Sequence, residues 1–163
     1  MPKYLIVYYS RTGHTEKLAQ ALAGKLNGDI ERVEDSSDRQ GSWAYFRSVF
    51  ESLSGALPQV ARPKVDLAAY DVVILGCPVW VSRPATPMRA FLAANAASLK
   101  TIACFCTYGG SGADKMLAQL EQAAGKPALA KLSLTEAQLS GNWQAAADTF
   151  VHNLTRTSAS ESA

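Results

Sequence analysis

The chain alternates short apolar runs with longer segments whose apolar residues recur at helical spacing. Runs near residues 3–8, 71–77 and 101–106 have the length of buried strands. The run at 72–75 is apolar on both faces, as a central parallel strand is. Two further strands are predicted at 30–33 and 128–134, the second at a sheet edge because its residues alternate. The pattern therefore predicts five strands.

Helices are predicted between these strands. Three leucines four residues apart indicate one helix at about residues 13–27, which ends at an Asn-Gly pair. Similar spacing predicts further helices at 42–54, from Thr86, before Gly125, and from Trp143 to Leu154. Strands that alternate with helices favour an open, mostly parallel sheet with helices on both faces. The fold class predicted from this pattern is α/β.

The length of the chain suits one domain. At 163 residues it can bury a substantial core, and we expect the domain to span residues 1–156. The small polar residues 157–163 are predicted to form a disordered tail. No apolar run approaches the roughly 18 residues of a membrane span, so the predicted location is cytoplasmic.

Charge and cysteine content narrow the class of protein. The net charge is +2 and no dense block of lysine and arginine is present, which argues against nucleic-acid binding. The number of cysteines is odd and all three lie in or at the ends of apolar runs, which argues against a disulfide framework. Cys104 and Cys106 are expected to be core thiols.

The segment after the first strand carries the strongest chemical signal. It reads Ser10-Arg11-Thr12-Gly13-His14-Thr15 and opens a helix, where unpaired backbone N–H groups attract an anion. The three hydroxyls can donate hydrogen bonds to a phosphate, and the glycine lets the backbone approach it. Capping of the helix by Thr12 would need one such residue, not three. We therefore predict a phosphate site, although no P-loop and no dinucleotide fingerprint is present.

The two charged side chains of this segment have less definite roles. Arg11 could add a cation near the phosphate or simply point to solvent. His14 lies at a helix N-terminus, where the dipole disfavours a positive imidazolium. We expect His14 to be neutral and to contribute mainly its backbone N–H.

Two further turns follow strands at the same predicted sheet edge, which is where open α/β sheets bind ligands. Trp80 lies beyond a strand end, so it could stack on a planar ligand or pack under its own loop. Tyr108, beside two glycines, could form a second wall, or the turn could offer exposed backbone N–H and C=O groups to a polar ring edge. The candidate binding residues of the second turn, 77–84, are Pro78, Val79, Trp80 and Val81. Those of the third are Thr107, Tyr108, Gly109, Gly110, Ser111 and Gly112.

Catalytic side chains are not evident. The three turns contain no Ser/His/Asp or Cys/His arrangement with a plausible nucleophile and no carboxylate pair. The cysteines lack the spacing of a metal site. We therefore assign no catalytic and no metal-binding residue, and any chemistry is expected to come from a cofactor.

The three turns resemble those of the flavodoxin family. Residues 10–15 match the family's first-loop pattern, Ser/Thr-x-Thr-Gly-x-Thr, and Asp71 to Pro78 followed by Trp80 is similar to its third strand and flavin-flanking loop. The resemblance covers residues 3–156. It implies a flavodoxin-like three-layer α/β/α sandwich with a five-stranded parallel sheet in the order 2-1-3-4-5. It also implies non-covalent FMN, with its phosphate in the first turn and its ring between the other two.

Charge around the second turn departs from the family pattern. Electron-carrier flavodoxins are usually acidic around the flavin, whereas this turn has no acidic residue and carries Arg83, with Arg47 and Arg89 as possible neighbours. A cation near the reduced, anionic flavin would raise its potential. The sequence is therefore less suited to a carrier of very low potential, although Arg83 could equally be a surface residue.

Three functions are compatible with the resemblance. The first is electron transfer through FMN to a redox partner protein or a small-molecule acceptor. The second is an NAD(P)H-dependent FMN-containing quinone reductase. The aromatic face of the helix at 42–54 could form a hydrophobic rim for a quinone or for a second subunit, although core packing explains its aromatic residues at least as well. The third is a flavin-free interaction protein with a flavodoxin fold, and the complete set of hydroxyls at residues 10–15 argues against it.

Overall fold

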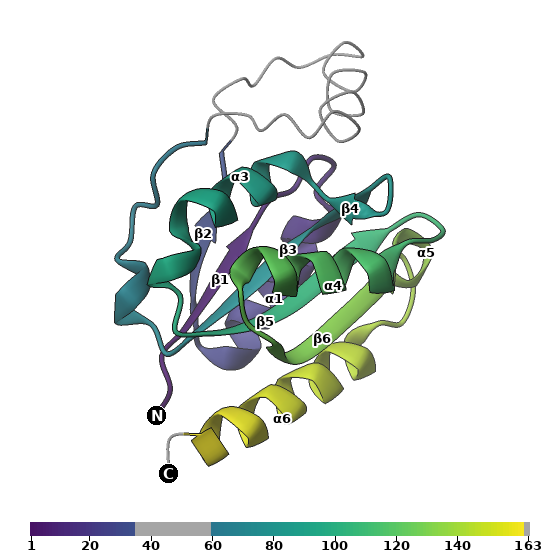
Figure 1. Ribbon diagram of the computed structural model, residues 1–163. Coiled ribbons are helices and arrows are strands. Elements are labelled where there is room, and N and C mark those ends of the chain that lie inside the picture. Colours follow the sequence, from purple (N-terminus) through teal and green to yellow (C-terminus); the bar gives the residue numbers. More distant parts are fainter. Residues whose placement is uncertain (35–59, 162–163) are drawn as a thin grey trace.

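A computed structural model describes residues 1–34 and 60–161 (Figure 1). Its parallel strands are β1 (Tyr4–Tyr8), β2 (Asp29–Arg32), β3 (Val72–Trp80), β5 (Thr101–Tyr108) and β6 (Ala128–Thr135), in the order β2-β1-β3-β5-β6. The two-residue strand β4 (Arg83–Pro84) lies off this path and pairs antiparallel with the end of β3. The predicted order 2-1-3-4-5 is therefore confirmed, with β4 as an addition.

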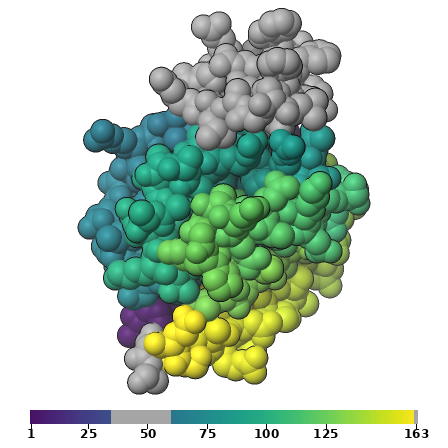
Figure 2. Space-filling model, in the orientation of Figure 1, coloured from purple at the N-terminus to yellow at the C-terminus, as the bar shows by residue number. Residues whose placement is uncertain are grey.

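Helices cover both faces of the sheet (Figure 1). On one face lie α1 (His14–Leu26) and α6 (Gln144–Glu161), and on the other α3 (Thr86–Asn95) and α4 (Ala113–Ala124). Shorter turns are η1 (Leu67–Ala69), η2 (Ala96–Ser98) and α5 (Glu136–Leu139). Figure 2 views the α4 side, with α6 below it. The predicted helix at 42–54 lies outside the described residues.

Alternate residues of the central strand supply two separate cores. In β3, Val73 and Leu75 belong to the core under α3 and α4, whereas Val72 and Ile74 belong to the core under α1 and α6. All four side chains are buried. Because burial of such a side chain contributes roughly 1.5–3 kcal/mol, both faces of β3 stabilise the fold. This two-sided burial explains why the sequence of β3 is apolar throughout.

The cysteines are part of the core under α3 and α4. Cys77, Cys104 and Cys106 are buried and none forms a disulfide. Burial raises the pKa of Cys104 to about 12 and that of Cys106 to about 12. The thiols therefore stay protonated at neutral pH, and the expectation that Cys104 and Cys106 are core thiols is confirmed.

The predicted disordered tail is wrong for residues 157–161, because α6 continues to Glu161. Ser158 is 3% exposed, and its hydroxyl lies 2.8 Å from the Tyr4 hydroxyl at the start of β1. The small side chain lets α6 approach the sheet, and its polar group is satisfied there. Residues 162–163 lie outside the described part. No helix in residues 1–34 or 60–161 is both long and apolar enough to cross a membrane.

Candidate functional site

The three turns predicted at residues 10–15, 77–84 and 107–112 are called the first, second and third segments below. Their residues meet at the carboxyl edge of the sheet. β3 and β5 stay paired until Pro78 lies beside Thr107, which places the second and third segments next to each other. The Oγ1 atoms of Thr15 and Thr107 are 2.7 Å apart and join the first segment to the third. The structure thus groups these segments into one site, while the binding role of each residue stays a prediction.

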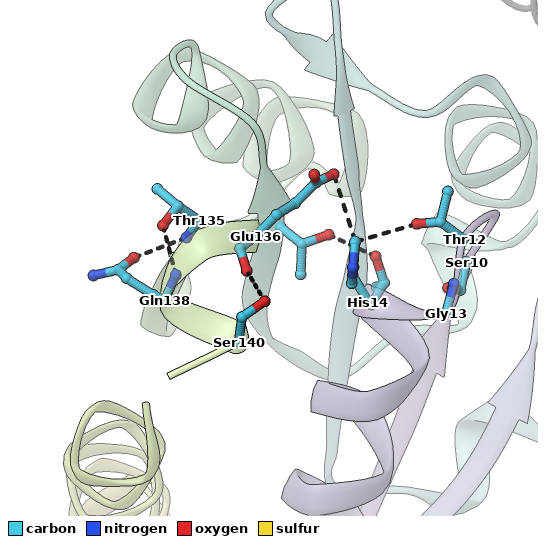
Figure 3. Close-up of polar contacts among 10 residues, drawn as sticks. Ser10, Thr12, Gly13, His14, Thr135, Glu136, Gln138 and Ser140 are labelled. Atoms are coloured by element: carbon cyan, nitrogen blue, oxygen red, sulfur yellow. Dashed lines mark hydrogen bonds and ion pairs between the residues drawn. The ribbon is translucent and has the colours of Figure 1, made fainter. Parts of the chain in front are cut away.

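The first segment ends at an open helix N-terminus (Figure 3). Gly13 is the N-cap of α1 with a φ of 95°, and no side chain caps the helix there. Ser10 is 3% exposed, and its Oγ accepts a hydrogen bond of 3.1 Å from the Gly13 N–H. Thr12 is exposed and does not cap the helix; its hydroxyl lies 3.3 Å from Nδ1 of His14.

The Thr15 and Thr107 hydroxyls form a buried pair, since each residue is 2% exposed. Two hydroxyls carry two protons, and their mutual hydrogen bond uses one of them. The remaining proton can be donated to an oxygen of a bound group. A Cβ at Gly13 would meet no atom within 4 Å, so there is open space at the helix start. Buried hydroxyls beside an uncapped helix N-terminus are a donor set that fits a phosphate ester.

Two charged residues that lie beside the first segment, Arg32 and Glu16, were not predicted as part of the site. Arg32, the last residue of β2, donates from Nη2 to the Ser10 carbonyl at 3.1 Å and lies 3.5 Å from Glu16. The Tyr8 hydroxyl donates to the same Glu16 carboxylate at 3.0 Å. Burial, and after it Glu16, raises the pKa of Tyr8, so its phenol keeps the proton it donates. This network positions the backbone at Ser10.

A fourth segment, the junction of β6 and α5, also borders the site (Figure 3). Oε1 of Glu136 lies 3.5 Å from Nδ1 of His14. Thr135 and Gln138 form a capping box that fixes the start of α5. Arg32 is the last residue of β2, and Glu136 directly follows the end of β6. The rule that strand ends gather at one sheet edge could have identified both residues.

The second segment is a hairpin, not the loop predicted for residues 77–84. β3 runs on to Trp80 and turns back through β4, with Val79 opposite Pro84 and Trp80 opposite Arg83. The turn residues Val81 and Ser82 have φ values of 51° and 57°. Such a turn is usually marked by Asn-Gly or Asp-Gly. Because Val-Ser lacks that signal, the hairpin was not predicted.

Trp80 is half-buried at the edge of the site and contacts Tyr9, the residue before the first segment. Its ring meets Tyr9 edge to face, with centroids 5.6 Å apart and an interplanar angle of 89°. Both rings also pack against the core under α3 and α4. Trp80 therefore packs partly on Tyr9 and the core, and its predicted stacking on a planar ligand stays a prediction.

The third segment begins within β5, because Thr107 and Tyr108 are its last residues. Gly109 and Gly110 are exposed, and a Cβ on either would meet no atom within 4 Å. Gly112 differs: its φ is 90°, and a Cβ there would lie 2.9 Å from Cα of Ser82. The third segment therefore offers open backbone at its tip and contacts the hairpin at its end.

The sheet order, its helical layers and this edge define an α/β protein with a flavodoxin-like fold. The chain belongs to the flavodoxin family, whose sequence model, described as Flavodoxin, matches residues 3–146. Membership of this family supports FMN as the cofactor. The resemblance found at residues 10–15 is thereby confirmed at the level of the family.

Solved structures share the fold. A flavoprotein from Lactobacillus acidophilus, solved in complex with FMN, superposes with a TM-score of 0.71 at 23% identity and covers 86% of this chain and 97% of its own. The flavodoxin, WrbA-like protein from Agrobacterium tumefaciens has a TM-score of 0.62 at 14% identity and covers 99% of each chain. At these identities the similarity concerns the fold.

Curated relatives share part of the sequence. The protein of Gluconacetobacter diazotrophicus named NAD(P)H dehydrogenase (quinone) is 35% identical over 96 residues, which are 56% of this chain and 45% of that protein. The chain thus spans about half the length of the curated relatives it matches.

Proposed function

We propose that this protein binds FMN without a covalent link and transfers electrons through it. The observation that carries the proposal is the uncapped N-terminus of α1 beside the buried hydroxyls of Ser10, Thr15 and Thr107. Hydroxyl groups and backbone N–H donors at a helix N-terminus are suited to a phosphate monoester. Membership of the flavodoxin family supports the same cofactor.

The residues of the chain would divide the binding between the two ends of FMN. The phosphate would be held by the hydroxyls of Ser10, Thr12 and Thr15 and by backbone N–H groups at the start of α1. Trp80 and Tyr108 would flank the ring, and the exposed backbone at residues 109–111 would meet its polar edge. Bound FMN supplies one- and two-electron redox chemistry, which the chain's own side chains do not provide.

A reductase is the second candidate function. The relatives named NAD(P)H dehydrogenase (quinone) favour it, with NAD(P)H as electron donor and a quinone as acceptor. The alternative partner for the same redox centre is an electron-transfer protein that docks at the flavin edge. The two candidates share the FMN site and differ in what delivers the electrons.

Anaerobic stopped-flow spectroscopy of the FMN-loaded protein tests both. Mixing with NADH or NADPH bleaches the flavin within seconds if the protein is a reductase, and added quinone then restores its absorbance. Absence of bleaching with both nucleotides, together with reduction by dithionite, identifies a carrier that needs a protein donor. A purified protein that neither carries nor takes up FMN would contradict the proposed function itself.

A further inference from the structure

A hollow lies between α3 and α4, away from the first segment. These helices lie side by side on one face of the sheet (Figure 1), on the side seen in Figure 2. The hollow has a volume of about 520 Å³, within the range of small-molecule sites. We call it the α3–α4 groove. Its walls include Arg83, Arg89, Ala93, Gln119, Gln122 and Ala123.

The groove follows from small residues at facing positions. On α3, Ala93 lies one turn after Arg89, and on α4, Ala123 lies one turn after Gln119. Residues four apart share a helix face, so both alanines face the same space. Their methyl groups leave room that larger side chains would fill. The β3–β4 hairpin closes one end through Arg83.

Arg89 lines the groove and also carries one buried, unsatisfied donor. Its Nη1 is buried and is the one buried side-chain nitrogen or oxygen in residues 1–34 and 60–161 that lacks a hydrogen-bond partner. Burial, followed by the charge of Arg83, lowers the pKa of Arg89. A buried donor without a partner costs roughly 1–3 kcal/mol, and more when it is charged. The buried Nη1 therefore costs stability, whereas the rest of the Arg89 side chain is partly exposed at the groove.

The lining favours an anion with a polar body. None of the described residues that line the groove is acidic, and two of them are arginines. Guanidinium groups match the geometry of phosphate and bind it through paired hydrogen bonds. The amides of Gln119 and Gln122 can both donate and accept hydrogen bonds. Two neighbouring positive charges suit a group with more than one negative charge.

We propose that the α3–α4 groove binds the phosphate or pyrophosphate group of a small molecule, which Arg89 and Arg83 hold. Arg83 lies opposite Trp80 in the hairpin, so the two strands of this hairpin would serve different sites. The groove is distinct from the hydroxyl-lined segment at residues 10–15, and its binding does not depend on FMN. A phosphorylated ligand in the groove would lie beside the wall of the proposed flavin site.

Isothermal titration calorimetry with inorganic pyrophosphate tests the proposal. The titration is made with FMN present in excess, which occupies the first segment, and is repeated without FMN. Arg89→Gln is compared with Arg156→Gln, which removes the same charge from an exposed position on α6, across the sheet. We expect Arg89→Gln to lower the affinity at least tenfold and Arg156→Gln to leave it within twofold. Equal affinities in the two variants, or no binding by the wild type, would overturn the proposal.

Thermal unfolding without pyrophosphate gives a second readout. Because Arg89 has an unsatisfied buried donor, Arg89→Gln should unfold at the same temperature as the wild type or higher. Pyrophosphate should raise the unfolding temperature of the wild type but not that of Arg89→Gln. A marked loss of stability in Arg89→Gln without ligand would instead identify Arg89 as a structural residue and count against the site.

The source of the phosphate is distinguished by competition. NADP⁺ that displaces pyrophosphate from the wild type, and loses affinity in Arg89→Gln, identifies a nicotinamide nucleotide as the ligand. Binding of pyrophosphate without competition by NADP⁺ supports the same site with another phosphorylated ligand. FMN uptake is measured separately by flavin absorbance, so failure of FMN binding and failure of the groove are separate results.

Discussion

The segment at residues 10–15 and the β3–β4 hairpin border the same site but are built differently. In the first, the left-handed position is a glycine, Gly13, and buried hydroxyls satisfy one another and the backbone. In the hairpin, Val81 and Ser82 take left-handed conformations without a glycine. Such conformations cost roughly 1–2 kcal/mol each and persist because their surroundings hold them. One segment is determined locally, and the other by its neighbours.

The largest effect on stability is expected at Gly112, which contacts the β3–β4 hairpin. Gly112→Ala places a Cβ at 2.9 Å from Cα of Ser82 and at a φ of 90°. Backbone strain and overpacking together should lower the free energy of unfolding by about 2–4 kcal/mol. The matched control is Gly125→Ala, which has a φ of 72° but no atom within 4 Å of the new Cβ.

Urea unfolding of the two variants separates strain from contact. The control should lose about 1–2 kcal/mol through its backbone alone. If Gly112→Ala loses no more than Gly125→Ala, the third segment does not hold the hairpin, and the comparison between the two regions fails.

How well each region could be predicted follows from this difference. The sheet order and the hydroxyl segment were predictable, because apolar runs and the Ser10-to-Thr15 pattern are contained in short stretches of sequence. The hairpin was not, since Val-Ser carries no turn signal and its shape depends on pairing with β3 and contact with Gly112. The end of α6 was missed for a similar reason: the burial of Ser158 against Tyr4 is a long-range contact.

A smaller effect on stability is expected from relieving the backbone strain in the turn of the hairpin. Replacing Val81 and Ser82 together by asparagine and glycine supplies the residues that tolerate left-handed backbone in such turns. Because Val81 is 53% exposed, little packing is lost. The double variant should gain about 1 kcal/mol, which corresponds to roughly 2–4 °C in the unfolding temperature. Calorimetry measures it, and a lower unfolding temperature would show that these side chains make stabilising contacts.

The central claim is that the hydroxyl segment holds the phosphate of FMN, and comparing FMN with riboflavin tests it most directly. Riboflavin has the same ring but no phosphate. Quenching of flavin fluorescence should show FMN binding at least about 100-fold more tightly, roughly 2.7 kcal/mol.

The same titration on two variants locates that difference. Thr15→Val should weaken FMN by about 1–3 kcal/mol, whereas Thr149→Val on the exposed face of α6 should not. FMN and riboflavin binding with equal affinity to the wild type would contradict the account.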